Sequence, residues 1–100
     1  MYAREYLVTE RTLLGAVDSF LKSVVHVRPQ LVNRFEEISE AWIDSWLEAG
    51  GANWLEAVDG KWLQSYLEQR GDARGEVEHF LRTFYAWAVK ENLLDAAPLN

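Results

Sequence analysis

The side chains most able to take part in chemistry gather on one stretch, residues 72–92, whose pattern predicts a helix. Its apolar residues recur at steps of three and four, which places them on one helical face. A second set of small, polar and basic residues recurs away from that face: Gly75, His79, Arg82, Thr83, Ala86 and Lys90. Arginine and lysine can neutralise phosphate groups. One buried face and one slender basic stripe suit a helix that lies in a groove.

Apart from an H-x-x-R spacing at His79 and Arg82, considered below, the sequence contains no motif of an enzyme or a metal centre. His26 and His79 are not accompanied by carboxylates in a ligand pattern. The absence of cysteine excludes disulfides and thiolate metal sites, and no glycine-rich phosphate loop is present. We therefore expect no enzyme activity in this chain, no metal and no cofactor.

Four helices are predicted to position the basic stripe. The breaks between them are expected near residues 27–30, 50–59 and 71–73. Pro29 marks the first break because the residue before a proline is pushed out of the helical conformation, and proline suits the first turn of the next helix. Gly50-Gly51 and Gly71 mark the other two breaks. Side chains expected to cap helix starts are those of Thr12, Asp59 and Asp72.

Large apolar residues form one face of each predicted helix. The expected core positions are Leu13, Leu14, Val17, Phe20, Leu21 and Val24, then Leu31, Phe35, Ile38, Trp42 and Trp46, then Trp62, Leu63, Tyr66 and Leu67, and finally Val77, Phe80, Leu81, Phe84, Trp87 and Ala88. Trp54 falls in a connector, where contact with a partner is an alternative to burial. One hundred residues, 49% of them hydrophobic, suffice for one domain with a modest core. The sequence predicts an all-α, compact four-helix bundle.

The negative charge of the chain is unevenly distributed. The formal net charge is −6, whereas a nucleic-acid binder usually has a basic balance. Residues 29–58 carry one arginine against six carboxylates. Four of these recur every fourth residue: Glu36, Glu40, Asp44 and Glu48. Such a stripe is a solvated face, a dock for a basic partner, or an electrostatic barrier that keeps DNA away from that side.

No feature of the sequence indicates a membrane protein or a secreted one. The longest apolar run is far shorter than the roughly 20 residues that span a bilayer. The first eleven residues lack the apolar core of a signal peptide. We expect an intracellular, cytoplasmic location and no membrane partner.

The end of the chain resembles a known family of DNA-binding domains. The segment FYAWAVKENLLDAAPLN, preceded by EVEHFLRT, is similar to the last helix and exit linker of the N-terminal core-binding domain of tyrosine recombinases, the SAM-like domain of phage integrases. The resemblance extends back to about Leu13 and consists of residue classes rather than invariant letters. It implies an N-terminal extension at 1–11, a SAM-like domain at 12–94, and at 95–100 the start of a linker to a separate catalytic domain.

The resemblance also implies which residues face DNA. In that family the domain is the upper half of a C-shaped clamp, and the start of its second helix and its fourth helix approach the recombination site. The matching positions here are Arg28, Gln30, Asn33 and Arg34, then Arg74, His79, Arg82, Thr83 and Lys90. Arginine can bind phosphate or guanine, and glutamine or asparagine can pair with adenine.

The sequence differs from the pattern of this family in three respects. His79 and Arg82 have the H-x-x-R spacing of the family's catalytic box, but that box belongs to the later catalytic domain, so we do not interpret them as catalytic. The second helix often begins with threonine in the family, whereas this chain has Pro29-Gln30. Glu76 and Glu78 occupy positions that are often basic or small and polar. Weak DNA binding by this domain alone is therefore expected.

Two classes of function follow from the sequence. The first is a DNA-binding module whose partners are double-stranded DNA, the catalytic domain of the parent recombinase and, on DNA, further copies of itself. The second is a helical protein–protein interaction domain that uses the acidic face of its second helix. Catalytic-domain motifs further along the parent reading frame would distinguish the first class from the second.

Overall fold

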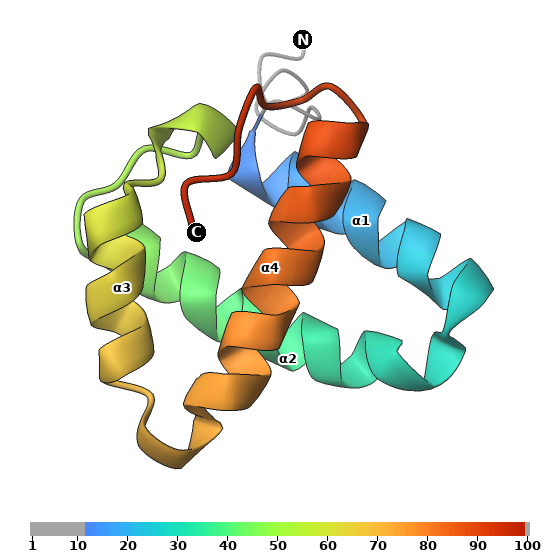
Figure 1. Cartoon of the computed structure of the whole chain (residues 1–100), viewed down its shortest axis with the longest axis horizontal. Coiled ribbons are helices and arrows are strands. Elements are labelled where there is room, and N and C mark those ends of the chain that lie inside the picture. The colour runs from blue at the N-terminus through green and yellow to red at the C-terminus, as the bar shows by residue number, and fades with distance from the viewer. Residues whose placement is uncertain (1–11, 100) are drawn as a thin grey trace, which may run out of the picture.

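A computed structural model describes residues 12–99, which form four α-helices (Figure 1). These are α1 (Leu13–Val27), α2 (Pro29–Glu48), α3 (Gly60–Glu68) and α4 (Arg74–Lys90). Two short 3-10 helices lie in the longer connections: η2 (Leu55–Ala57) and η3 (Gly71–Ala73). Residues 12–99 contain no β-strand, so the prediction of an all-α, four-helix domain is confirmed. The predicted extension at 1–11 lies outside the described residues.

Two of the three predicted helix caps are present. Thr12 Oγ1 accepts a hydrogen bond from the backbone N–H of Gly15 at 3.0 Å. The carboxylate of Asp59 accepts one from the N–H of Trp62 at 3.1 Å. The cap predicted at Asp72 is wrong, because this residue lies inside η3 and α4 begins only at Arg74. The chain leaves α3 through a 3-10 turn rather than directly, which moves the helix start beyond the reach of Asp72.

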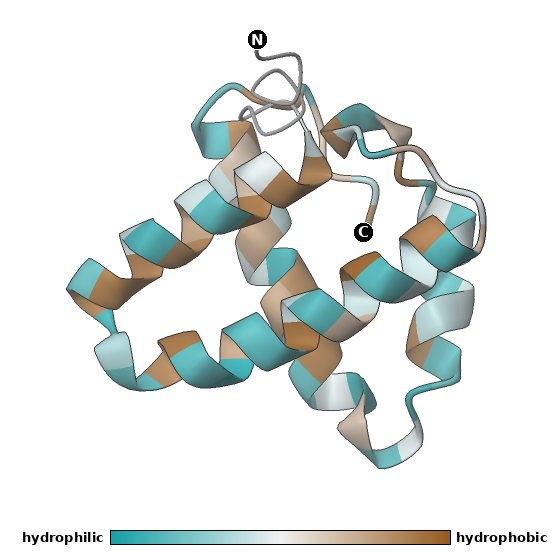
Figure 2. Cartoon of the chain, turned by 180° about the vertical axis from the view of Figure 1, so that it is seen from behind, coloured by the Kyte–Doolittle hydropathy of each residue, from teal (hydrophilic) through white to brown (hydrophobic). Residues whose placement is uncertain are grey.

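The helices cross rather than run parallel. α1 and α2 run in opposite directions and are joined through Arg28, with Pro29 in the first turn of α2 as predicted. α4 crosses in front of α2 in Figure 1 and packs against α1, α2 and α3. In the reverse view of Figure 2, α1 and α2 lie in front of α4. The domain therefore has one face that includes α4 and an opposite face built from α1 and α2.

Aromatic side chains from three helices meet at the centre of the core. Trp42 of α2 has no exposed surface. Its ring lies edge-on to the rings of Phe80, Phe84 and Tyr85 on α4, at centroid distances of 6.0, 5.7 and 6.0 Å. Phe20 of α1 contacts Phe84 at 5.5 Å. The crossing of α4 over α1 and α2 thus buries the apolar face that its sequence predicts.

Most predicted core positions are buried or packed against the core, with one clear exception. Leu14 is 44% exposed and lines a groove between α1 and α2 instead of the core. Trp87 is only partly buried and packs at the edge of the core against Phe20, at 5.6 Å. The core also includes residues not predicted from periodicity: Ile43, Leu55, Val58, Tyr85 and Leu99.

The chain turns back after α4 and packs against α3. Two residues beyond the end of α4 at Lys90, Asn92 adopts a left-handed backbone, at φ +62°. The returning segment passes between α3 and α4 (Figure 1), and Leu99 is only 5% exposed. It runs so close to α3 that a Cβ atom on Gly60 would lie 2.5 Å from the carbonyl oxygen of Pro98. The packed body therefore continues past residue 94, while the role of residues 95–100 as a linker stays a prediction.

No helix within residues 12–99 combines the length and the apolar character that a membrane span requires.

Candidate nucleic-acid interface

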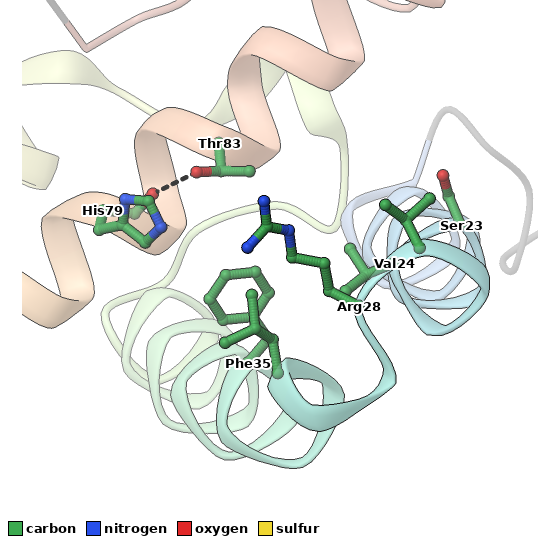
Figure 3. A pocket seen from close by; sticks show the side chains of 8 residues that line it. Ser23, Val24, Arg28, Phe35, His79 and Thr83 are labelled. Carbon is green, nitrogen blue, oxygen red and sulfur yellow. Dashed lines mark hydrogen bonds between the residues drawn. The ribbon is translucent and has the colours of Figure 1, made fainter.

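A groove opens where the end of α1, the start of α2 and the middle of α4 meet. Its volume is about 400 Å³. The residues that line it are Ser23, Val24, Val27, Arg28, Leu31, Phe35, His79 and Thr83. We call it the Arg28 groove. Figure 3 shows the Arg28 side chain reaching from the junction of α1 and α2 toward Phe35 and α4.

The α4 side of the Arg28 groove is held by local contacts. Thr83 Oγ1 donates a hydrogen bond to the backbone carbonyl of His79 at 2.7 Å (Figure 3). The His79 ring lies against the buried ring of Phe35, at a centroid distance of 6.2 Å. The imidazole is otherwise exposed. His79 and Thr83 lie one helical turn apart, so both reach the same groove.

Arg34 does not join the Arg28 groove, because two glutamates hold it elsewhere. Its Nε donates to Glu76 Oε2 at 2.6 Å and its Nη2 to Glu76 Oε1 at 2.5 Å, while Nη1 donates to Glu37 Oε1 at 3.0 Å. These hydrogen bonds, the one to Glu76 first, raise the pKa of Arg34 above its ordinary value. The hydrogen bond from Arg34 lowers the pKa of Glu76. The charge of this predicted DNA contact is thus balanced within the protein.

Two further predicted arginines share one carboxylate on α4. Arg82 Nε donates to Glu78 Oε2 at 2.9 Å. Arg74 Nε lies 3.8 Å from Glu78 Oε1 on the other side. The side chains of Arg74, Glu78 and Arg82 all remain partly exposed. A phosphate group could therefore compete with Glu78 for the two arginines.

The remaining predicted residues lie on the surface outside the groove. Gln30, Asn33 and Lys90 are exposed. Within residues 12–99, neither Arg28 nor Lys90 forms an ion pair with a carboxylate. Of the nine predicted residues, the fold therefore brings Arg28, His79 and Thr83 into one groove and pairs Arg34, Arg74 and Arg82 with glutamates.

The apolar walls of the Arg28 groove were not predicted as part of a site. Phe35, Leu31 and Val24 match the apolar periodicity of the helices, and that signal indicates only a core position. Val27, at the end of α1, is 76% exposed. In the sequence, the signal that could have indicated this wall is an apolar residue directly before the helix break at Arg28-Pro29.

Comparisons of the chain with models of protein families, with curated proteins and with solved structures gave no match. The function proposed below therefore depends on the geometry of the Arg28 groove and on the resemblance of the sequence.

Proposed function

We propose that this domain binds double-stranded DNA as the core-binding domain of a tyrosine recombinase or integrase. Its bundle would then be of the SAM-like type, and a separate catalytic domain of the parent protein would cleave and rejoin the strands. The observation that supports this most is the meeting of Arg28, at the start of α2, with His79 and Thr83 of α4. These are the two elements that approach DNA in the family that the sequence resembles.

The chemistry of the Arg28 groove fits a sugar-phosphate backbone. The guanidinium of Arg28 can form charge-assisted hydrogen bonds with phosphate oxygens. The His79 imidazole, at the rim on α4, can donate a further hydrogen bond. Val27 and Leu31 offer apolar surface to the carbons of a deoxyribose. Contacts of this kind position a protein on DNA without reading its sequence.

The charge balance of the domain predicts weak binding. Among the arginines and the lysine predicted to contact DNA, only Arg28 and Lys90 form no ion pair within residues 12–99. Each neutralised phosphate contributes about −0.9 to the slope of log affinity against log salt concentration. Two such contacts give a slope of about −2, which would become steeper where phosphates displace Glu76 or Glu78 from the arginines. Most of the affinity of the parent protein would come from its catalytic domain.

The test is a salt series of duplex-DNA binding by this chain and by its Arg28→Ala variant. Arg28→Ala is expected to weaken binding about equally for all sequences and to lower the salt slope by about one. Lys61→Ala is the matched control, because Lys61 is an exposed cation on α3, away from the Arg28 groove. An unchanged slope for Arg28→Ala, or equal losses for both variants, would overturn the assignment of this groove to DNA.

The catalytic part of the proposal has its own test. Neither DNA cleavage nor rejoining is expected from this chain alone. The parent reading frame is expected to encode a catalytic domain with the arginine, His-x-x-Arg and tyrosine motifs of tyrosine recombinases. A parent sequence without them would contradict the recombinase assignment even if the domain bound DNA.

A further inference from the structure

A second groove runs between α1 and α2 on the face away from α4. Its volume is about 340 Å³, and all the residues that line it belong to α1 or α2. The Arg28 groove, by contrast, includes His79 and Thr83 of α4. Figure 2, which looks onto this face, shows α1 and α2 side by side in front of α4. The two grooves therefore open on different faces of the domain.

The floor of the α1–α2 groove is apolar and one of its leucines faces solvent. Val17 and Ile43 are buried beneath it, and Leu21 is half-buried. Leu14 is the exposed leucine described above, held at the start of α1 by a hydrogen bond from its N–H to Asn53 Oδ1 at 3.2 Å. An exposed leucine over buried valine and isoleucine leaves a strip of apolar surface that another apolar side chain could cover.

The rim of the α1–α2 groove is acidic. Glu36, Glu40 and Asp44 line it from three successive turns of α2, and Asp18 lines it from α1. Asp18 is paired with Lys22 at 3.1 Å. Within the part of the chain that the structure describes, no cation pairs with Glu36, Glu40 or Asp44. Three carboxylates in a row beside an apolar strip attract basic groups and repel phosphate.

We propose that the α1–α2 groove binds a basic amphipathic helix of a partner protein. Apolar side chains of the helix would cover Leu14 and Leu21, and its lysines or arginines would pair with Glu36, Glu40 and Asp44. This is the arrangement in which a helix places apolar anchors in a groove and charged residues at the rim. It is independent of DNA binding at the Arg28 groove.

The charges of the chain favour a partner protein over other occupants. A second copy of this chain is a poor fit, because its net charge is −6 and its arginines Arg34, Arg74 and Arg82 are already paired with its own glutamates. The N-terminal residues 1–11 balance Arg4 and Arg11 against Glu5 and Glu10, so they offer no excess positive charge. A basic helix is the occupant whose charge complements this rim.

The test uses a synthetic peptide of about 15 to 20 residues, long enough to form a helix, with leucines at steps of three and four and lysines elsewhere. Calorimetry measures its binding to the chain, and NMR maps the residues that respond. We expect shifts centred on Leu14, Leu21 and Ile43. The double variant Glu40→Gln/Asp44→Asn should weaken binding roughly tenfold, and Leu14→Ser by a similar factor. A peptide of the same composition with its leucines scrambled should bind far more weakly.

Matched variants separate a specific groove from a general attraction between charges. Glu56→Gln/Glu68→Gln removes two exposed carboxylates outside the groove and changes the net charge equally. Leu47→Ser removes a different exposed leucine, which lies on α2 and outside the groove. Both should leave the affinity for the peptide unchanged, and Glu40→Gln/Asp44→Asn should not weaken duplex-DNA binding. No peptide binding, equal losses in the control variants, or self-association that Leu14→Ser abolishes would each overturn the proposal.

Discussion

Arg34 on α2 and Glu76 on α4 form a two-point ion pair that joins helices far apart in the sequence. Both oxygens of the carboxylate accept from the guanidinium, at 2.6 and 2.5 Å. Glu37 binds a third nitrogen of the same arginine at 3.0 Å. The pair fastens the start of α4 to α2, and it also keeps a predicted DNA contact occupied. Its two roles can be separated by experiment.

The first prediction concerns acid stability. The pKa of Glu76 is lowered in the folded chain, so its contribution to stability is present above the ordinary pKa of 4.5 and is lost as pH falls through the lower folded pKa. Glu76→Gln should therefore show a smaller loss of melting temperature than the wild type between about pH 6 and pH 3. The control is Glu48→Gln, which removes one exposed carboxylate of α2 that forms no ion pair within residues 12–99. Identical acid profiles for Glu76→Gln and wild type would contradict the ion pair.

The second prediction concerns DNA. In the proposed DNA complex Glu76 would compete with phosphate for Arg34, so Glu76→Gln should raise the affinity for duplex DNA and steepen the salt slope by at most about one, because Glu37 still pairs with the arginine. The double variant Arg34→Ala/Glu76→Gln should lose this steepening, since no freed guanidinium remains. A gain in affinity that persists in the double variant would point to net charge alone rather than to Arg34.

The third prediction concerns the core. Phe84 is fully buried and contacts Phe20, Trp42 and Tyr85, at centroid distances of 5.5, 5.7 and 5.0 Å. Phe84→Ala should lower the free energy of unfolding by about 3–5 kcal/mol, through lost burial and the cavity that remains. Denaturant titration followed by circular dichroism measures this change. A near-neutral result would mean that α4 does not present this face to the core.

The fourth prediction concerns a buried hydroxyl. Tyr85 has no exposed surface, and its hydroxyl has no hydrogen-bond partner within residues 12–99. A buried unsatisfied polar group costs about 1–3 kcal/mol. Tyr85→Phe keeps the ring and removes the hydroxyl, so it should raise the free energy of unfolding by about 1 kcal/mol. Destabilisation by Tyr85→Phe would instead indicate a hydrogen bond that the structure lacks.

The same variant should also change the response to alkali. Burial raises the pKa of Tyr85 above its ordinary value of 10.0. In the folded chain the Tyr85 hydroxyl keeps its proton above pH 10. In the unfolded chain it loses the proton there, which lowers the free energy of the unfolded state relative to the folded one. The stability of the wild type should therefore fall as pH rises past about 10, and Tyr85→Phe should fall less steeply.

Local signals in the sequence predicted most of the helices. Proline and glycine mark the three breaks, and Thr12 and Asp59 cap helices as expected, because these features act within a few residues of themselves. The cap at Asp72 failed because an intervening 3-10 turn depends on how α3 and α4 pack. The prediction that Leu14 is a core residue was wrong for a related reason. Periodicity defines an apolar face, but the neighbouring helices decide how wide a part of that face is covered.

The candidate site was less predictable than the fold. The pairing of Arg74 and Arg82 with Glu78 follows from spacings of four residues, which sequence alone can indicate. The pairing of Arg34 with Glu76 depends on the crossing of α2 and α4, which no local pattern specifies. The same crossing creates the Arg28 groove. Sequence therefore predicted which cations are present, but tertiary structure determines which of them are available to a ligand.

The aromatic surroundings of Trp42 give the domain a distinctive optical behaviour. Its indole is fully buried among the rings of Phe80, Phe84 and Tyr85, and its fluorescence should lie at short wavelength and resist quenching by iodide. Trp54, 49% exposed, should emit at longer wavelength and be quenched readily. In a variant with Trp46, Trp62 and Trp87 replaced by phenylalanine, fluorescence from the two remaining positions would report the integrity of the core and the state of the surface separately.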